Sequence, residues 1–237
     1  MTLTSETRAP VGTRERPIIF SGPMVRAILA GRKSMTRRIL KPQPPEGARY
    51  TGIHYACDEP PSWFFNSPRC GHKVRQAFEE GDHLWVKETH MFVGGGDPGI
   101  PLRRADWRDD AARQGLENIP AEEPKGWRSP LFMPRWASRL TLEVTEVRVE
   151  RLQDISEADA VAEGICPCGG GWSVAPDDVE TSADTARWAY QKLWCRLHGP
   201  ASYEANPWVA AITFRLLPAN ESQKEGAADS ASVKERA

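Results

Sequence analysis

The sequence predicts a mixed α+β fold, in which a small β-barrel carries short flanking helices and two long loop insertions. Strand candidates alternate with short helices and long irregular stretches, and this order favours a mixed barrel over a regular parallel sheet. The longest strand candidate, residues 139–149, changes face between Val144 and Val147, because its apolar residues shift from even to odd positions. A bulge or sharp bend there is what a barrel strand needs to turn a corner.

The composition is that of a globular protein with one good-sized domain or two small ones. The 237 residues are 40% hydrophobic and 27% charged, which is ordinary for such proteins. No apolar run approaches the ~18 residues of a membrane helix, and residues 1–15 lack the apolar core of a secretory signal. We therefore expect a cytoplasmic protein without a membrane partner, whose five cysteines are reduced thiols.

The order of polar and apolar segments predicts one domain over residues 16–217. Two polar tails, 1–15 and 218–237, lack hydrophobic periodicity and are expected to be disordered. Insertions lie near 46–79 and 92–130, where proline, glycine and aromatic residues follow no clear period. We expect both insertions to be long and irregular.

The first half of the domain contains three strand candidates and one helix candidate. Residues 17–20 predict a strand, and a helix follows with Pro23 at its first helical position and Gly31 as its end. Residues 34–40 return to extended structure and stop before three prolines. A turn at Gly81 leads into a further strand over residues 83–86.

The second half begins with the strand over residues 139–149. A short helix over 156–163 follows, capped by Ser156 and ended by Gly164. An amphipathic helix is expected over 182–197 and a last strand over 208–216. The core positions expected on that helix are Trp188, Leu193, Trp194 and Leu197.

A dense group of cations between residues 26 and 41 is the main candidate for chemistry. No acidic residue occurs between Glu15 and Glu46, although the whole chain has a net charge of −1, so any nucleic-acid contact must come from a local patch. Cations attract phosphates, and arginine also stacks on bases. A solvated basic turn paired with acids elsewhere is the alternative. The candidate substrate- or nucleic-acid-binding residues are Arg32, Arg37, Arg38, Lys41 and, as a stacking residue, Trp136.

This segment resembles the ASCH motif, G-x-K-x-x-E-x-R, with Gly31, Lys33 and Arg38 matching and Thr36 at the glutamate position. Small ASCH proteins that hydrolyse N4-acetylcytidine carry the similar G-R-K-x-x-T-x-R. Residues 81–86 are similar to the family's G-D-x-L-x-V strand, and Glu163 stands where these amidohydrolases place a catalytic glutamate. Residues 17–216 also resemble ASCH-like proteins of phages and prophages, including the segments 133–139 and 206–208. The resemblance implies a barrel related to PUA domains.

The first function class that the resemblance implies is an amidohydrolase acting on an acylated cytidine or a related nucleoside, without a cofactor. Thr36 would attack the amide, and Lys33 would take its proton because neighbouring cations free the amine. Glu163 would protonate the leaving nitrogen and Arg38 would hold the oxyanion. This mechanism requires these side chains to meet in one cleft, and it requires a bend at residues 34–35.

The second function class is a non-catalytic module that binds RNA or a modified base, serving a phage for example. The two insertions, which the small amidohydrolases lack, favour this class because they can cover or reshape the pocket. A phage assembly protein that uses the barrel only as a scaffold is a third interpretation. Fold alone does not choose among them.

Cysteine and histidine raise a separate question about zinc. Mixed sets of these residues are typical of structural zinc sites, but neither C-x-H nor C-x-C is the usual C-x-x-C spacing. We therefore expect no metal site and treat the cysteines as free thiols. The residues in question are Cys57, Cys70, His72, Cys166 and Cys168.

Overall fold

The computed structural model describes residues 14–56, 59–68, 70–176 and 178–218 of the chain. Most of the two predicted disordered tails lies outside these residues. Glu15, predicted to end the first tail, instead begins the first strand. The domain therefore starts slightly earlier than the hydrophobic pattern indicates.

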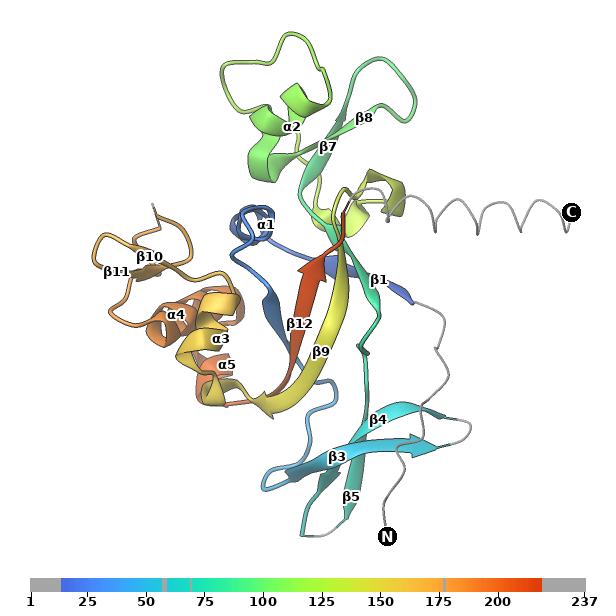
Figure 1. Cartoon of the computed structure of the whole chain (residues 1–237), viewed down its shortest axis with the longest axis vertical. Helices are drawn as coiled ribbons and strands as arrows, with labels where there is room; N and C mark the ends of the chain where they lie inside the picture. The colour runs from blue at the N-terminus through green and yellow to red at the C-terminus, as the bar shows by residue number, and fades with distance from the viewer. Residues whose placement is uncertain (1–13, 57–58, 69, 177, 219–237) are drawn as a thin grey trace, which may run out of the picture.

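A five-stranded sheet forms the centre of the molecule, with the strand order β1-β6-β9-β12-β2 (Figure 1). β1 pairs in parallel with β6, and the other pairs are antiparallel. The strands are β1 (Glu15–Ile19), β2 (Met35–Ile39), β6 (His83–Lys87), β9 (Thr141–Arg151) and β12 (Trp208–Leu216).

The mixed α+β class is confirmed, whereas a closed barrel is not observed within the described residues. β1 and β2 are the two edges of the central sheet and do not pair with each other. A side chain links them instead, because Arg38 Nη2 on β2 donates to the Ile19 carbonyl of β1 over 2.9 Å.

The predicted change of face in the long strand is confirmed as a β-bulge. On β12, Thr213 lies opposite Glu146 and the next residue, Phe214, lies opposite Val144. Thr145 is therefore an extra residue on β9, and it moves the apolar positions to the other parity.

In Figure 1 the helices α1, α3, α4 and α5 lie on the left of β9 and β12. α1 packs into one hydrophobic cluster, and α3 and α4 pack into another. Ser156 caps α3 as predicted, since its hydroxyl accepts from Asp159 N over 3.0 Å. The α-helices are α1 (Gly22–Leu29), α3 (Glu157–Ala162), α4 (Ala186–His198) and α5 (Pro200–Glu204). Short 3₁₀ turns lie at η1 (Arg104–Asp106), η2 (Pro130–Phe132), η3 (Arg135–Ala137) and η4 (Leu152–Asp154).

The predicted amphipathic helix is shifted toward the C-terminus, because Thr185 caps α4 by accepting from Trp188 N. Leu193 and Trp194 are buried as expected. Trp188 and Leu197, which were expected in the core, are 47% and 48% exposed. The buried face of α4 does not include Trp188, and Leu197 lies in the last turn of the helix; the face consists of Ala186, Ala189, Tyr190, Leu193 and Trp194.

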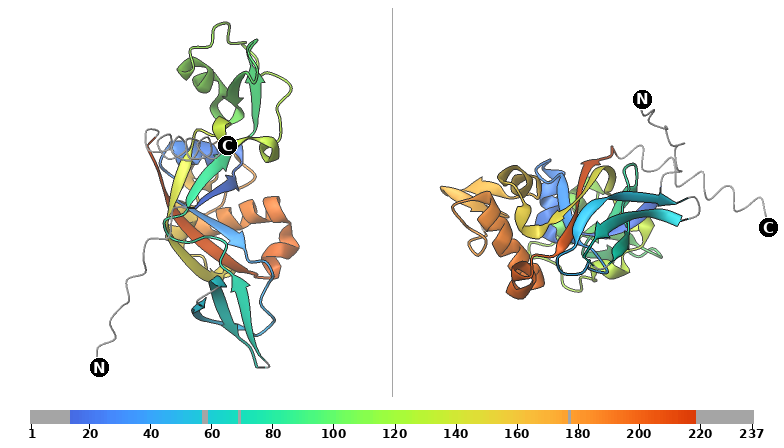
Figure 2. Two further views of the ribbon diagram at one scale, coloured as in Figure 1. Left: turned by 90° about the vertical axis from the view of Figure 1, so that its right-hand side faces the viewer. Right: turned by 90° about the horizontal axis from the view of Figure 1, so that it is seen from below.

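Both insertions were expected to be irregular, and both contain regular structure. They form small sheets at opposite ends of the long axis (Figure 2). Prolines and glycines interrupt the alternation of polar and apolar residues by which strands are recognised in a sequence. Trp63 and Phe65 are nevertheless buried two positions apart. The first insertion contains β3 (Arg49–Ala56), β4 (Glu59–Asn66) and β5 (Gly71–Arg75). The second contains β7 (His90–Val93), β8 (Ile100–Arg103) and α2 (Trp107–Arg113). A third hairpin joins β10 (Cys166–Cys168) to β11 (Gly171–Ser173).

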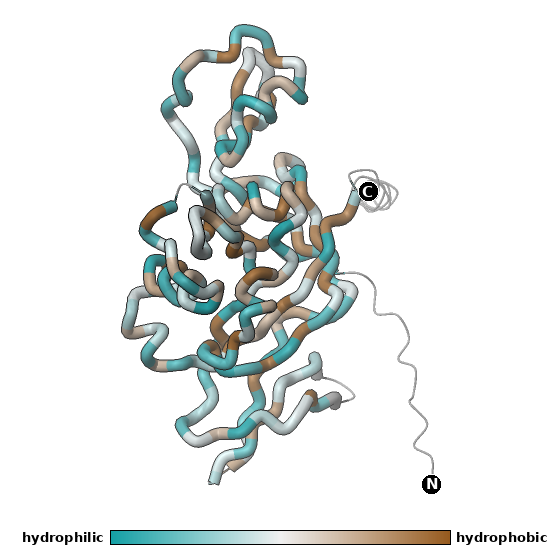
Figure 3. Tube along the Cα trace, turned by 60° about the vertical axis from the view of Figure 1, so that its left-hand side comes forward, coloured by the Kyte–Doolittle hydropathy of each residue, from teal (hydrophilic) through white to brown (hydrophobic). Residues whose placement is uncertain are grey.

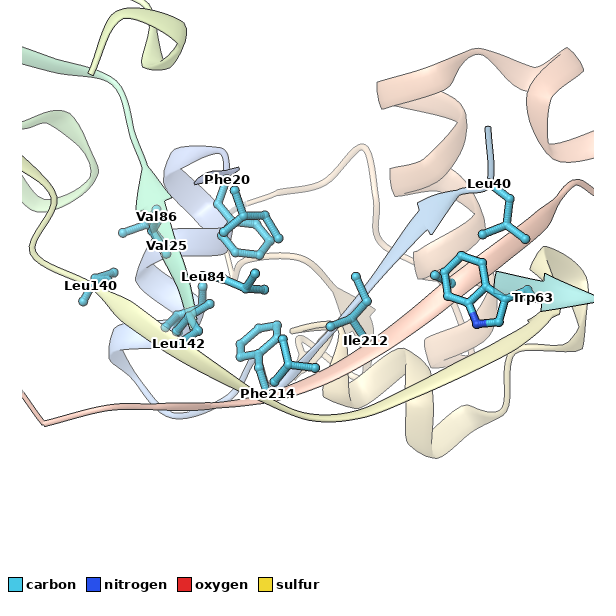
Figure 4. Packing of buried hydrophobic residues seen from close by; sticks show 14 of the residues in the cluster. Phe20, Val25, Leu40, Trp63, Leu84, Val86, Leu140, Leu142, Ile212 and Phe214 are labelled. Carbon is cyan, nitrogen blue, oxygen red and sulfur yellow. The ribbon is translucent and has the colours of Figure 1, made fainter. Parts of the chain in front are cut away.

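Two hydrophobic clusters form the core, one on each face of the central sheet. The larger cluster packs α1 and β4 against the sheet around Phe20, Leu142 and Phe214 (Figure 4). The smaller cluster packs α3 and α4 around Leu193 and Trp194. In Figure 3 hydrophobic (brown) segments are interspersed with hydrophilic (teal) ones through the central part of the molecule. Within the described part of the chain, no helix has the length and apolar character to cross a membrane.

Candidate functional site

The motif lysine and the helix-end glutamate meet directly, although 130 positions separate them in the chain. Lys33 Nζ lies 2.7 Å from Glu163 Oε2. Local structure produces this contact: Gly31, with φ of 68°, ends α1, and Ser34 N bonds the Ala162 carbonyl at the end of α3. Gly164 follows with φ of 102°, and a Cβ there would come within 3.3 Å of Lys33 Cβ. The close approach of these two segments thus requires glycine.

The Lys33–Glu163 pair is closed to solvent. The Lys33 side chain is 0% exposed and that of Glu163 is 3% exposed. Burial lowers the pKa of the Lys33 ammonium from its ordinary value, while the Glu163 carboxylate opposes this shift. The direction agrees with the sequence prediction, but the leading cause is desolvation rather than repulsion by neighbouring cations.

Every donor of the Lys33 ammonium is used within this site. Lys33 Nζ donates to the Met35 carbonyl at 2.7 Å, to the Glu163 carbonyl at 2.8 Å and to the Glu163 carboxylate. An ammonium has three donors and no acceptor, so this geometry is that of a protonated lysine. A general base needs a free lone pair at that nitrogen.

Arg37 extends the ion pair into a buried network on the α3 face. Its side chain is 0% exposed and lies 2.6 Å from Glu150, 2.7 Å from Asp159 and 3.4 Å from Glu163. This corrects the expectation that Arg37 belongs to a surface that binds nucleic acid, because three carboxylates already occupy its guanidinium. Such networks stay in place because unpaired buried charges are very costly.

Thr36 does not join the Lys33–Glu163 pair. It lies within β2 opposite Ile212 and is 4% exposed. The three Lys33 donors reach other oxygens, so no hydrogen bond links Lys33 to Thr36. Lys33 itself precedes β2, and the turn in this segment lies at residues 30–31 rather than at the predicted residues 34–35. The structure therefore brings Lys33 and Glu163 together without an open cleft at Thr36.

The other predicted cations lie on the outside of this region. Arg32 and Lys41 are exposed, and Arg38 is half-buried. Arg32 Nη1 bonds the Gly164 carbonyl at 3.3 Å, and the Arg38 guanidinium lies 5.4 Å from the centre of the Phe20 ring. These three side chains can offer N–H donors to an anion, whereas Lys33 and Arg37 cannot.

Trp136 lies on a different surface, close to β7. It is 52% exposed and stacks on Phe92 with 5.3 Å between ring centroids and 28° between planes. The Arg128 guanidinium packs 5.3 Å from the Phe92 ring, and Phe132 nearby in the chain is 76% exposed. We call these four residues together with Arg135 the aromatic surface.

A second buried ion cluster was missed by the sequence predictions. Arg139 binds both oxygens of Glu88, at 3.0 and 2.9 Å, and also contacts Asp106 and Asp110. Burial raises the pKa of Glu88, and the Arg139 guanidinium opposes this shift. Strand alternation could have indicated this position, because Glu88 follows the buried Leu84 and Val86 at a period of two.

The cysteine and histidine residues do not form a zinc site among the residues described. No group of three metal-binding side chains occurs there. Cys70 Sγ lies 3.2 Å from His72 Nε2 in the first insertion, whereas Cys166 and Cys168 lie on β10, on the other side of the molecule (Figure 1). Cys57 falls outside the described residues.

Comparison with family models, with characterised proteins and with solved structures identifies no relative of this chain.

Proposed function

We propose that the chain is an ASCH-type, PUA-like protein that binds single-stranded RNA or a modified base without transforming it. The family assignment rests on the motif at residues 31–38. The observation that carries the binding function is Trp136, exposed and stacked on Phe92 beside the cation Arg128. Aromatic platforms flanked by cations are the usual means of holding unpaired bases.

Two aromatic rings of the aromatic surface are exposed to solvent. Phe132 and Trp136 leave much of their apolar area in water, and Trp136 stacks on Phe92. Exposed apolar patches mark interaction sites. A base can cover such rings by stacking, while Arg128 attracts the phosphates. Arg135 contributes less, because it donates two hydrogen bonds to the carboxylate of Glu15, at 2.9 and 2.8 Å. Because the chain as a whole has a net charge of −1, selectivity for nucleic acid depends on local groups such as these.

A contact between the two edge strands of the central sheet bears on the proposed fold family. The Arg38 side chain, which links the edge strands β1 and β2, supports a barrel-like arrangement closed by a side chain. A cytoplasmic location and a phage origin remain predictions from the sequence. The exposed Arg32 and Lys41 are expected to supply a second, weaker phosphate contact.

Trp136→Ala is expected to weaken binding of a short single-stranded RNA about 5- to 150-fold, because stacking on one aromatic ring is worth about 1–3 kcal/mol. Fluorescence anisotropy with a labelled oligonucleotide measures the change. Binding by the wild type should also weaken as salt rises, since phosphate neutralisation releases counterions.

Trp188→Ala is the matched control. Trp188 is 47% exposed and also lies beside a cation, Lys192, at 4.8 Å, but it belongs to α4 on another surface. Its loss should leave RNA affinity unchanged. Equal affinities for wild type and Trp136→Ala, or no RNA binding by the wild type at low salt, would refute the aromatic surface as the binding site.

An amidohydrolase is the second candidate, favoured by the 2.7 Å contact between Lys33 and Glu163. We expect no turnover of N4-acetylcytidine by the wild type, because the Lys33 donors are all occupied and the pair is buried. Mass spectrometry of the nucleoside after prolonged incubation tests this expectation.

Two substitutions make the test of the amidohydrolase specific. Thr36→Val removes the hydroxyl at nearly constant volume, and Thr36→Ser keeps it. Turnover by the wild type that disappears in the valine variant and persists in the serine variant would establish Thr36 as a nucleophile, and the binding module would then be the wrong function.

A further inference from the structure

His90 lies at the junction between the second insertion and the aromatic surface. It is 0% exposed and begins β7. On one side it pairs with Arg103 of β8, and on the other side its backbone forms an isolated bridge with Arg128. Arg128 N donates to the His90 carbonyl over 2.7 Å. His90 therefore holds the segment that contains Arg128 against β7.

The His90 ring also supports the stacked rings of the aromatic surface. It packs edge-on against Phe92, with 5.3 Å between ring centroids and 77° between planes. The same Phe92 ring stacks on Trp136 and contacts the Arg128 guanidinium. The geometry of the aromatic surface thus depends on the position of one buried imidazole.

The surroundings of His90 favour its neutral form. Nδ1 lies 3.2 Å from the Glu88 carbonyl, which can only accept, so the proton of the neutral ring is on Nδ1. Nε2 is buried and has no hydrogen-bond partner among the described residues. A second proton would therefore place a positive charge and an unsatisfied N–H in the interior, and both are costly.

The charges around His90 add to this cost. The acids of the adjoining ion cluster, Glu88 and Asp110, are already paired with Arg139. Burial lowers the pKa of His90 from its ordinary value, neighbouring cations lower it further, and the hydrogen bond to the Glu88 carbonyl opposes them. These cations come from the elements packed against His90: Lys87 at the end of β6, Arg103 on β8, and Arg128.

We infer that neutral His90 positions the aromatic surface and that its protonation opens the surface, so that RNA affinity falls in acid. The choice of RNA as the ligand rests on the proposed function, whereas the opening does not. β7 and β8 form a sheet of two strands, and such a pair is marginally stable by itself, so one proton can shift the opening equilibrium. In the opened state His90 titrates near its ordinary pKa of about 6.5. The surface is therefore fully formed above this pH and opens progressively below it.

The RNA affinity of the full chain is measured from about pH 7.5 to about pH 5.5, on either side of the ordinary pKa of histidine. A labelled oligouridylate is the probe, because its bases do not titrate in this range. Uptake of one proton changes the ratio of open to closed surface at most about tenfold over the range, so we expect the dissociation constant to rise about three- to tenfold.

Two substitutions at His90 remove the titration. His90→Phe keeps an aromatic ring against Phe92 and cannot be protonated, so its affinity should be the same at both ends of the pH range. His90→Asn keeps a donor for the Glu88 carbonyl, should behave alike, and serves if the phenylalanine variant does not fold. His54→Phe is the matched control, because His54 is an exposed histidine on β3 in the first insertion. This control should keep the pH dependence of the wild type.

Hydrogen exchange of the Arg128 amide, followed by NMR without RNA, gives a readout that is independent of the proposed function. Its protection should fall in acid in the wild type and not in His90→Phe. Loss of protection in acid without any RNA binding would keep His90 as the residue that controls the surface and would refute RNA as the ligand. RNA binding by the wild type with equal affinity across the pH range, or the same loss of affinity in His90→Phe as in the wild type, would overturn the inference and leave RNA binding itself intact.

Discussion

Glu163→Gln is expected to lower the free energy of unfolding by about 3–5 kcal/mol, the usual cost of removing one partner from a buried ion pair. The substitution leaves the Lys33 ammonium, which is 0% exposed, with two carbonyl oxygens and no counter-charge. It also removes the 3.4 Å ion pair between Glu163 and Arg37. Urea denaturation followed by far-ultraviolet circular dichroism measures the loss.

A double-mutant cycle shows whether the cost belongs to the pair. Lys33→Met/Glu163→Gln should cost less than the sum of the two single substitutions, because the second change removes the charge that the first one leaves unpaired. Glu180→Gln is the control, since Glu180 is 81% exposed in its ion pair with Arg196, and it should change stability by less than about 1 kcal/mol. Additive losses in the cycle would show that Lys33 and Glu163 do not stabilise each other.

RNA binding by the Glu163 variant also shows whether the Lys33–Glu163 pair takes part in the proposed function. A Glu163 variant that remains folded and binds RNA like the wild type would indicate that the Lys33–Glu163 pair maintains the position of α3 against β2. Lost RNA binding in a folded variant would contradict the separation of the pair from the aromatic surface.

Arg139→Met is expected to destabilise the protein by about 3–5 kcal/mol, because it leaves the buried Glu88 without the guanidinium that pairs with both of its oxygens. Arg139 contacts Glu88, Asp106 and Asp110 at 2.5–3.1 Å. Arg139→Lys should recover only part of the loss, since an ammonium cannot reproduce the two parallel bonds to Glu88. Chemical denaturation of the three proteins gives the comparison.

Arg113 provides a control that shares two of these carboxylates. It reaches Asp106 and Asp110 from outside and is itself 52% exposed. Arg113→Met should therefore cost less than about 1 kcal/mol. Similar losses for the two arginine variants would mean that the burial of Arg139 contributes nothing beyond the ion pairs themselves.

Local patterns in the sequence predicted a large part of the fold. The strand around Val144, the helix capped by Ser156 and the helix ended by Gly31 depend on residues close in sequence, and the structure contains all three. The insertions were predicted poorly, because β3, β4 and β5 are stabilised by pairing with one another. Their prolines and glycines also interrupt the alternation by which isolated strands are recognised.

For the candidate site, the family resemblance predicted that Lys33, Thr36, Arg38 and Glu163 meet in one cleft. Lys33 and Glu163 are in contact, whereas Thr36 lies within β2 and Arg38 bonds the Ile19 carbonyl. Arg37 was predicted to be a surface cation because it stands in a run of cations. The partners that bury it, Glu150 and Asp159, come from β9 and α3, more than a hundred positions away.

The sequence by itself determined the mixed α+β class, the bulge in β9, the ends of α1 and α3 and the identity of the cationic segment. Each of these depends on backbone preferences and on periodicity within about ten residues. Tertiary structure alone decided which charges are buried and which remain in water. The burial of a charge depends on the elements that cover it, and for Lys33, Arg37 and Glu88 those elements are distant in the chain. The same packing leaves Trp136 exposed, where the proposed RNA ligand would bind.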